Sequence, residues 1–233
     1  MIKKADEMIL YIDIEHIRVK ELYANLWEKH LSRTLDIKYR LEEVGQEECL
    51  ILRYEKLSHE RLSKLKPKAV LVSGNMTEFQ HYSENDLAGL RQTFLNARQP
   101  ILGFCGGAQM MAETFGSTAA AIDADGVGDM LDENWKERIH EFGFTPVRKL
   151  KEHALLEGLK DEFEVMEMHY WEIKELPEGF EQLAETDVTP LQIIAHKTLP
   201  LYGTQFHPEA WDSNHTDGRT FLENFFKLAN QQQ

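Results

Sequence analysis

The sequence predicts an α/β fold: an open, mostly parallel sheet with helices on both faces and an antiparallel extension in its second half. Between residues 8 and 115, short apolar runs alternate with segments of helical periodicity. Alternating strands and helices indicate parallel pairing, because each helix carries the chain back to the same edge of the sheet. Beyond residue 140, strand-like runs follow one another with short turns between them. These runs form either an antiparallel extension or return strands of the same sheet. The open, mostly parallel sheet with helices on both faces would be flavodoxin-like.

The first half supplies four strands and three helices. Runs rich in Ile, Leu and Val predict strands at 8–14, 50–54, 69–73 and 100–104. Helices are expected at about 19–43, 83–97 and 106–115. Leu22, Leu26, Leu31 and Leu35 give the first helix its spacing. Ser83, followed by Asp86 three residues later, resembles a capping box at the start of the second.

The second half predicts strands at 142–147, 163–169, 191–196 and 202–206. The last helix is expected at 220–229, where Phe221, Phe225 and Leu228 share one face. Pro and Gly are scattered, and no internal repeat or linker divides the chain. We therefore expect a single domain over residues 1–233.

Composition excludes several classes of protein. Lys and Arg number 26 against 40 Asp and Glu, which gives a net charge of −14. A protein that binds nucleic-acid phosphates needs a basic surface, so we expect no nucleic-acid partner. No apolar run approaches the roughly 18 residues of a membrane span, and the N-terminal region lacks a secretory pattern. Two cysteines are too few for a disulfide framework. The sequence thus predicts a cytoplasmic protein without a membrane partner.

Cys105 is the candidate nucleophile. It lies where the fourth strand meets its helix, within the run GFCGGAQ at 103–109. Small neighbours allow the strained backbone of a sharp strand-to-helix turn and give a substrate access. The amide N–H groups and the dipole at a helix N-terminus favour a thiolate and can stabilise an oxyanion. The alternative is that Cys105 is a buried apolar residue, which is our interpretation of Cys49.

His207 and Glu209 supply the other half of a catalytic set, in GTQFHPE at 203–209. A thiol nucleophile needs a base, and the base needs an acceptor that fixes its tautomer. In an extended segment, residues two apart point to the same side, so Glu209 can reach one imidazole nitrogen while the other faces the thiol. The His-x-Glu spacing is poor for zinc, and the acidic segment 123–129 departs from a calcium loop at two ligand positions. We expect no metal.

Together, GFCGGAQ and GTQFHPE resemble the motifs of the class I, triad-type glutamine amidotransferase domain. The resemblance extends from about residue 8 to residue 228. It includes LVSGN at 71–75, EVMEMHYWEI at 164–173, LPEGFEQLAETD at 176–187 and PLQIIAH at 190–196. Two separated motifs in the family's order, about 100 residues apart, make the resemblance specific.

The resemblance implies roles for the three residues. Cys105 would attack the side-chain amide of glutamine, His207 would act as general base and acid, and Glu209 would orient His207. Ammonia would leave, and water would then hydrolyse a γ-glutamyl thioester. The resemblance implies no cofactor, and a separate synthetase or acceptor subunit would use the ammonia.

The resemblance also implies an oxyanion site. Its donors would be the backbone N–H of Gly106 and one from the Gly74–Asn75 turn. Here Asn75 and Met76 replace the family's second Gly and Pro, and Asn tolerates left-handed backbone better than most residues. Gly107 replaces a larger residue common in biosynthetic members.

Four further residues match positions around the family's glutamine pocket: Gln109, His169, Tyr170 and Trp171. From the residues alone, Gln109 could instead face solvent, and His169 could be a structural histidine in a strand. Tyr170 and Trp171 are bulkier than the family's common Gly-Asp or Ser-x pair. Such a bulky lip could close the pocket or favour a substrate other than free glutamine.

Three functions fit these observations. The first is the glutaminase unit of an amidotransferase. The second is a stand-alone hydrolase of γ-glutamyl amines or peptides, motivated by Tyr170 and Trp171. The third is a binding or regulatory module without turnover, motivated by the altered Asn75 turn. The complete set of Cys, His and Glu argues against the third.

Overall fold

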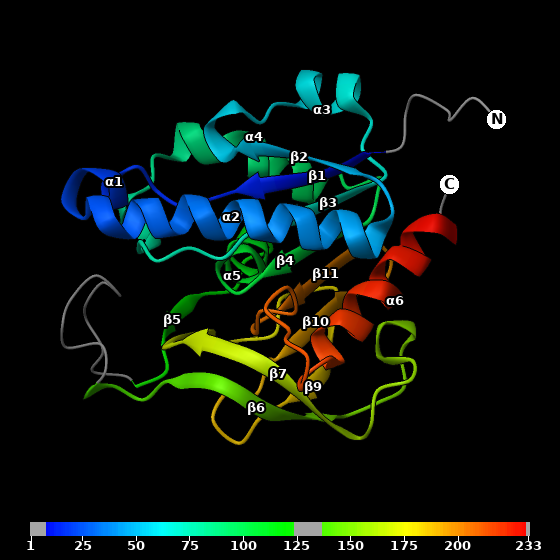
Figure 1. Cartoon of the computed structure of the whole chain (residues 1–233). Helices are drawn as coiled ribbons and strands as arrows, with labels where there is room; N and C mark the ends of the chain where they lie inside the picture. The colour runs from blue at the N-terminus through cyan, green and yellow to red at the C-terminus, as the bar shows by residue number, and fades with distance from the viewer. Residues whose placement is uncertain (1–7, 124–136, 232–233) are drawn as a thin grey trace.

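The computed structural model describes residues 8–123 and 137–231, and the chain traces an α/β sandwich around one large sheet (Figure 1). The strands of the first half are β1 (Met8–Asp13), β2 (Glu48–Arg53), β3 (Ala69–Val72), β4 (Ile101–Phe104) and the short β5 (Ala119–Ala121). Those of the second half are β6 (Glu141–Lys149), β7 (Glu162–His169), β8 (Trp171–Ile173), β9 (Phe180–Glu185), β10 (Ile193–His196) and β11 (Leu201–Thr204). The α-helices are α1 (Arg18–Leu22), α2 (Ala24–Gly45), α3 (His59–Leu65), α4 (Glu84–Leu95), α5 (Gly106–Thr114) and α6 (Asp217–Gln231).

The large sheet has the strand order β2-β1-β3-β4-β11-β10-β9-β6-β7, and β5 pairs with β8 in a separate ladder. From β2 to β11 the neighbouring strands are parallel, and from β11 to β7 they are antiparallel. The predicted open sheet with an antiparallel extension is therefore confirmed. Of the two interpretations of the second half, β11 is a return strand beside β4, whereas β10, β9, β6 and β7 form the extension.

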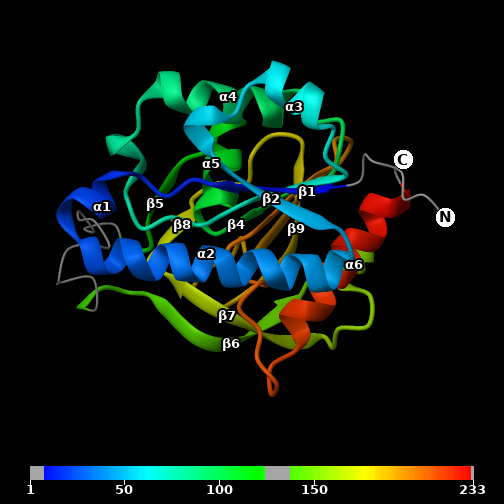
Figure 2. The same ribbon diagram turned by 45° about the horizontal axis from the view of Figure 1, so that its top comes forward.

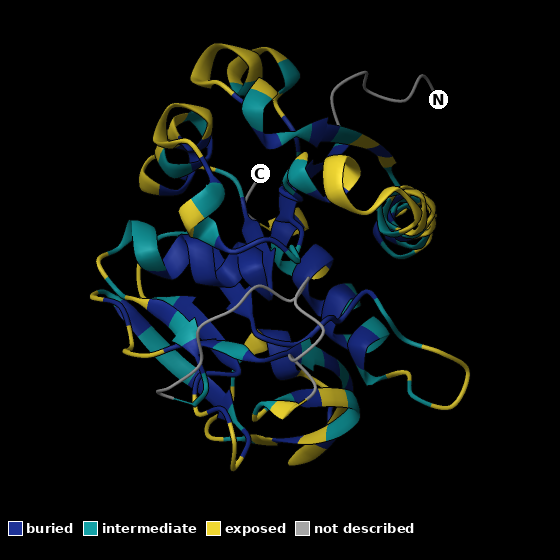
Figure 3. Ribbon diagram, turned by 90° about the vertical axis from the view of Figure 1, so that its left-hand side faces the viewer, coloured by how far each residue is buried: buried dark blue, intermediate teal, exposed yellow. Residues whose placement is uncertain are grey.

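Successive residues of the central strands pack on opposite faces of the sheet, as strand geometry requires. In β1, Ile9 and Tyr11 join the core beneath α2 and α6, whereas Leu10 and Ile12 join the core beneath α3, α4 and α5. Figure 2 shows the helices on the two sides of the sheet. Figure 3 shows buried residues concentrated along the sheet and in α5. This double coverage explains why these strands are apolar throughout rather than alternating.

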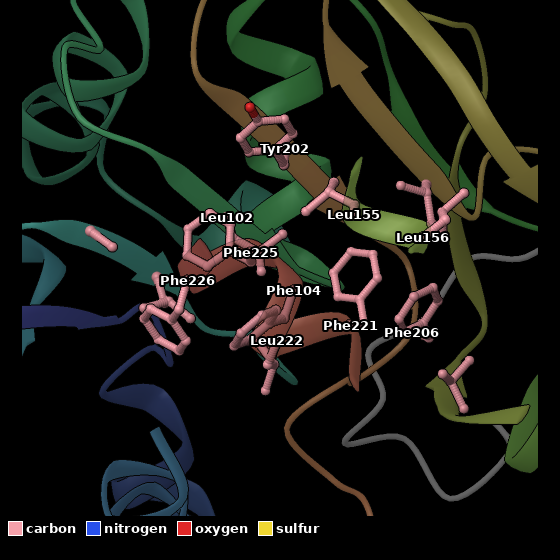
Figure 4. Packing of buried hydrophobic residues seen from close by; sticks show 14 of the residues in the cluster. Leu102, Phe104, Leu155, Leu156, Tyr202, Phe206, Phe221, Leu222, Phe225 and Phe226 are labelled. Carbon is pink, nitrogen blue, oxygen red and sulfur yellow. The ribbon is translucent and has the colours of Figure 1, made fainter. Parts of the chain in front are cut away.

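The C-terminal helix closes one of these cores. The aromatic residues Phe221 and Phe225 of α6 are fully buried and pack near Phe104, Tyr202 and other core residues (Figure 4). The predicted face of α6 is confirmed, with Leu228 partly buried beside it. Since the cluster includes Phe104 at the end of β4, this packing fixes the strand that precedes Cys105.

The leucine spacing of the first predicted helix misidentified its buried face. The segment forms two helices, α1 and α2, separated at Tyr23. Leu31 and Leu35 are about half exposed, and α2 instead buries a face that includes Ile37 and Leu41. That face is buried because it contacts β1, β2 and α6. The spacing of leucines within one helix carries no information about these contacts.

Other local expectations were also wrong. Ser83 precedes α4 with extended backbone, but its side chain makes no capping hydrogen bond, so no capping box forms. The sequence pattern did not predict β5, β8 or β9, two of which are three residues long. Most of the acidic segment 123–129 lies outside the described residues. Among the helices of the described residues, none is long and apolar enough to cross a bilayer.

Candidate active site

Cys105 occupies a strained turn at the carboxyl end of β4. Its φ of 45° and ψ of −109° lie in a region that non-glycine residues rarely adopt. Its N–H donates to the Thr204 carbonyl at 2.7 Å, and its own carbonyl accepts from the Gln109 N–H at 3.0 Å. The neighbouring strand and the first turn of α5 thus hold this conformation. Strain at such a strand-to-helix turn is typical of an exposed nucleophile.

The glycines around Cys105 allow α5 to lie directly on the sheet. A Cβ atom at Gly103 would lie 2.6 Å from the Ala108 nitrogen, and one at Gly107 would lie 2.5 Å from the Val72 carbonyl oxygen. Neither distance is compatible with a side chain, because backbone atoms cannot yield as a flexible side chain can. The replacement of a larger residue by Gly107 therefore follows from the close packing of α5 on β3 in this chain.

His207 and Glu209 lie next to this turn. His207 follows β11, and its N–H donates to the Met166 carbonyl of β7 at 2.8 Å. Its Nδ1 lies 2.8 Å from Glu209 Oε1, and both side chains are buried. A Cβ at Gly74 would lie 2.9 Å from His207 Cε1 and 3.4 Å from Cys105 Cβ. The fold therefore brings the three predicted residues together, with Gly74 leaving room for the imidazole and the thiol.

The environment of His207 favours its protonated form. Burial by itself would lower the pKa of His207, but the Glu209 carboxylate and the contact with Cys105 outweigh it and raise the pKa to about 9. Burial would raise the pKa of Glu209, whereas the charges of His207 and Arg33 lower it below its usual range. Arg33 Nη2 lies 3.8 Å from Glu209 Oε1. The arrangement stabilises an imidazolium beside the thiol.

The turn at residues 74–76, which carries one of the candidate oxyanion donors, is held by hydrogen bonds to neighbouring side chains. Asn75 Nδ2 donates to the Tyr82 hydroxyl at 3.1 Å. The Met76 N–H donates to Oε2 of the buried Glu15 at 2.7 Å. The Asn75 nitrogen lies 3.2 Å from the place a Gly106 Cβ would occupy, so the two predicted donor residues are adjacent. The φ angle of Asn75 is not positive. The ability of Asn to adopt a left-handed backbone therefore does not explain why Asn is found at this position.

A cleft of about 390 Å³ opens beside Cys105. It is lined by Asn75, Met76, Thr77, Glu78, Phe79, Cys105, Gln109, Met168, His169, Tyr170 and Trp171. All four predicted pocket residues line it, together with Cys105.

Gln109 is buried in the cleft wall and does not face solvent. Its Nε2 donates to the Trp171 carbonyl at 3.0 Å and to Gln205 Oε1 at 3.1 Å. Gln205 Nε2 in turn donates to Cys105 Sγ at 3.5 Å. Gln109 therefore links the segment around Trp171 to the thiol.

His169 belongs to a buried ionic cluster. Its Nε2 lies 3.2 Å from Glu141 Oε2 and 3.0 Å from Glu167 Oε2, and its Nδ1 lies 2.9 Å from the Trp171 carbonyl. Burial would lower the pKa of His169, but the two carboxylates raise it to about 10. The imidazolium then donates through Nδ1 and holds the Trp171 carbonyl in place.

Glu141, Glu167 and His169 are also the one group among the described residues whose donor atoms are close enough to hold a metal ion. Both carboxylates lie at ion-pair distance from His169 Nε2 and stabilise the imidazolium form of His169. The sequence reasoning missed Glu141 and Glu167, although Glu167 lies two residues before His169 and so on the same side of its strand.

A second cavity, of about 830 Å³, reaches His207 and Glu209 from the side of α2. His207, Glu209, Arg33 and Glu15 contribute to its walls, and Gly74, Asn75, Met76 and Met168 border it. Arg33 and Glu15 were not predicted, since neither belongs to a sequence motif and both come to the site through tertiary packing.

The two thiols should differ strongly in reactivity. Burial raises the pKa of Cys49 to about 12. The charge of Lys38 lowers this pKa and the Glu42 carboxylate raises it, but burial is the largest effect. Cys105 instead lies at a helix N-terminus beside the His207 imidazolium. With limiting iodoacetamide at pH 7.5, we expect nearly all early label on Cys105, measured by peptide mass spectrometry. A Cys49→Ala control should label at an unchanged rate, and equal labelling of both cysteines would contradict an activated turn.

The chain is similar to A subunits of glutamine-hydrolysing GMP synthases. The A subunit of the glutamine-hydrolysing GMP synthase of Methanocaldococcus jannaschii is 37% identical over 136 residues, which are 58% of this chain and 63% of that protein. The chain thus aligns with less than two thirds of that relative. The corresponding protein of Thermococcus kodakarensis is 31% identical over 181 residues, 74% of this chain and 81% of that protein.

A similar fold occurs in the crystal structure of a candidate GMP synthase A subunit from Thermoplasma acidophilum. It superposes with a TM-score of 0.73 at 24% identity and covers 98% of this chain and 96% of that one. Residues 28–229 match the family model described as "Glutamine amidotransferase class-I". The chain belongs to the class I glutamine amidotransferase family.

Proposed function

We propose that this protein is the glutaminase unit of an amidotransferase, which hydrolyses the side-chain amide of L-glutamine and passes ammonia to a separate subunit. The observation that carries the proposal is that Cys105, which lines the cleft, lies next to His207 and its partner Glu209. Family membership and the nature of the relatives support it.

The reaction begins with attack of the Cys105 thiolate on the amide carbon of glutamine. The developing oxyanion faces backbone N–H groups at Gly106 and Asn75, which lie beside each other at the start of α5. The His207 imidazolium donates its proton to the leaving nitrogen, ammonia departs, and a γ-glutamyl thioester remains. Glu209 holds Nδ1, so the other ring nitrogen is directed to the reacting atoms.

Hydrolysis of the thioester reverses these roles. Neutral His207 accepts a proton from water, whose oxygen attacks the thioester carbon. The carbon–sulfur bond breaks, glutamate leaves, and the thiolate and imidazolium are restored. The Gln205 amide, 3.5 Å from Cys105 Sγ, donates to the sulfur in the resting state.

The acceptor of the ammonia is proposed from the relatives. The similar proteins of M. jannaschii and T. kodakarensis are A subunits of glutamine-hydrolysing GMP synthases. We propose that this chain likewise works with a synthetase subunit that aminates a nucleotide. His207 and Glu209 line the cavity bounded by α2, which shares Asn75, Met76 and Met168 with the substrate cleft.

The test measures glutamate formation by the purified chain, alone and with a synthetase subunit from the same source. We expect hydrolysis of glutamine that rises at least several-fold in the mixture, and glutamine-dependent GMP formation only when both proteins are present. The synthetase alone should make GMP from ammonium salts. Absence of glutamate in both conditions, with correctly folded protein, would overturn the proposal.

A stand-alone γ-glutamyl amine hydrolase is the second candidate, favoured by the presence of Tyr170 and Trp171 in the cleft wall. A panel of γ-glutamyl amines measured beside glutamine separates the two. Higher kcat/KM for a γ-glutamyl amine than for glutamine, without any effect of the synthetase, would favour this candidate.

A further inference from the structure

The cleft beside Cys105 holds a buried carboxylate oxygen without a partner. Glu78 is only 9% exposed and lines the cleft. Gln80 Nε2 donates to its Oε2, but its Oε1 has no hydrogen-bond partner among the described residues. A buried acceptor left unpaired is costly, so it calls for an explanation.

The same cleft holds an unpartnered donor. Trp171 lines it, and the indole Nε1–H is buried without a hydrogen-bond partner among the residues that the structure describes. Buried indole N–H groups usually find an acceptor. Glu78 and Trp171 come from separate segments of the cleft wall, one after the oxyanion turn and one after β7. They do not satisfy each other.

The charges along the cleft narrow the choice of ligand. Glu78 is the one carboxylate among the cleft-lining residues of the described chain. The other charged group, the His169 imidazolium, is already engaged by Glu141 and Glu167. A ligand that fits must therefore bring a cation to Glu78 and an acceptor to Trp171.

We propose that Glu78 binds the α-ammonium group of the substrate and that the Trp171 indole N–H donates to its α-carboxylate. The substrate is then a γ-glutamyl compound with a free α-amino acid end, whose amide points to Cys105. This inference rests on the proposed function, because it takes the cleft as the glutamine site. It assigns Glu78, which no sequence motif marked, as a specificity-determining residue.

The backbone around both residues is suited to this role. Gln109 and His169 hold the Trp171 carbonyl at 3.0 and 2.9 Å, so the start of β8 is fixed against α5. On the other side, Thr77 Oγ1 donates to Glu15 Oε1 at 3.0 Å, which anchors the residue before Glu78. Both groups are thus presented by restrained segments, and binding requires little ordering.

The experiment uses two chloromethyl ketones that alkylate Cys105. One is L-2-amino-5-chloro-4-oxopentanoate, and the other is 5-chloro-4-oxopentanoate, which lacks the amino group. We expect the wild-type protein to react about 10- to 100-fold faster with the amino-bearing reagent, the loss expected for one charge-assisted hydrogen bond. In Glu78→Gln the preference should fall to within about threefold, since the charge is gone but the shape remains.

Trp171→Phe should behave differently. It removes the indole N–H that both reagents would use, so both should react more slowly while the preference for the amino group persists. Iodoacetamide, which carries neither group, should react with Cys105 equally in all variants and thus reports an intact nucleophile. Glu113→Gln is a matched control, because Glu113 lies on α5 but is paired with Arg91 and does not line the cleft.

The outcomes separate the two proposals. A Glu78→Gln protein with the wild-type preference would overturn this inference while leaving glutamine hydrolysis intact. A wild-type protein that neither hydrolyses glutamine nor distinguishes the two reagents would overturn the proposed function itself.

Discussion

Replacing Cys105 by alanine is expected to abolish glutamine hydrolysis, with a loss of roughly 10⁴- to 10⁶-fold in kcat, the range seen when an enzyme loses its nucleophile. The thiolate is the group that would form the γ-glutamyl thioester, and no other side chain that lines the cleft within the described residues is a comparable nucleophile. Hydrolysis is measured as glutamate release, and intact-mass spectrometry should detect no acyl adduct.

The fold should survive this substitution. Alanine keeps the Cβ and removes only the sulfur of a residue that is 7% exposed, and the strained φ is imposed by the backbone bonds of residue 105 rather than by its side chain. We expect the midpoint of urea unfolding to change little. Cys49→Ala supplies the matched control: it should retain activity. Residual turnover by Cys105→Ala at more than about one hundredth of wild type would refute the assignment.

Replacing Glu209 by glutamine is expected to lower kcat/KM by roughly 10³- to 10⁴-fold, as for a triad that loses the carboxylate behind its histidine. The amide keeps the size of the side chain but removes the charge that stabilises the imidazolium. Burial then dominates, and the pKa of His207 falls from about 9.

This change carries a pH signature. His207 must be protonated to release ammonia, so activity should be present below about pH 9 and be lost above it in the wild-type protein. In Glu209→Gln the alkaline limb of the kcat/KM profile should move to lower pH, because the imidazolium is lost earlier. Asp212→Asn, which removes an exposed carboxylate three residues away, should leave the limb in place. An unmoved limb in Glu209→Gln would show that Glu209 does not set the charge of His207.

Much of the fold could be predicted from local pattern. The four apolar runs of the first half became β1, β2, β3 and β4, because buried parallel strands are apolar on both faces and stand out from amphipathic helices. Short strands were harder. Three-residue β5 and β8 carry too few residues to show a period, and their pairing joins segments that are distant in the sequence.

The helix faces show where local pattern fails. Leu31 and Leu35 repeat at a helical spacing and yet are exposed, whereas the buried face of α2 includes Thr34 and Gly45. The same face also carries Ile37 and Leu41, so contacts with other elements of the fold decide which of two partly apolar faces is buried.

The same distinction applies to the cleft. The resemblance pointed to Gln109, His169, Tyr170 and Trp171, and all four line it. Glu78, Arg33 and the two carboxylates around His169 carry no motif. Glu78 and the two carboxylates owe their importance to burial, which changes the energy of a charge far more than sequence neighbours do. Arg33 is partly exposed and reaches Glu209 across the fold.

The sequence by itself determined the class of fold, the family and the identity of the thiol, imidazole and carboxylate, because strand periodicity and two short motifs are local properties of the chain. Only the tertiary structure decided that these groups meet, that His169 is held as an imidazolium between two acids, and that Glu78 and Trp171 face one cleft with unpaired polar atoms. The proximity of these groups, the charge of His169 and the unpaired polar atoms depend on distances across the fold and on the exclusion of water. No single segment of the sequence determines either.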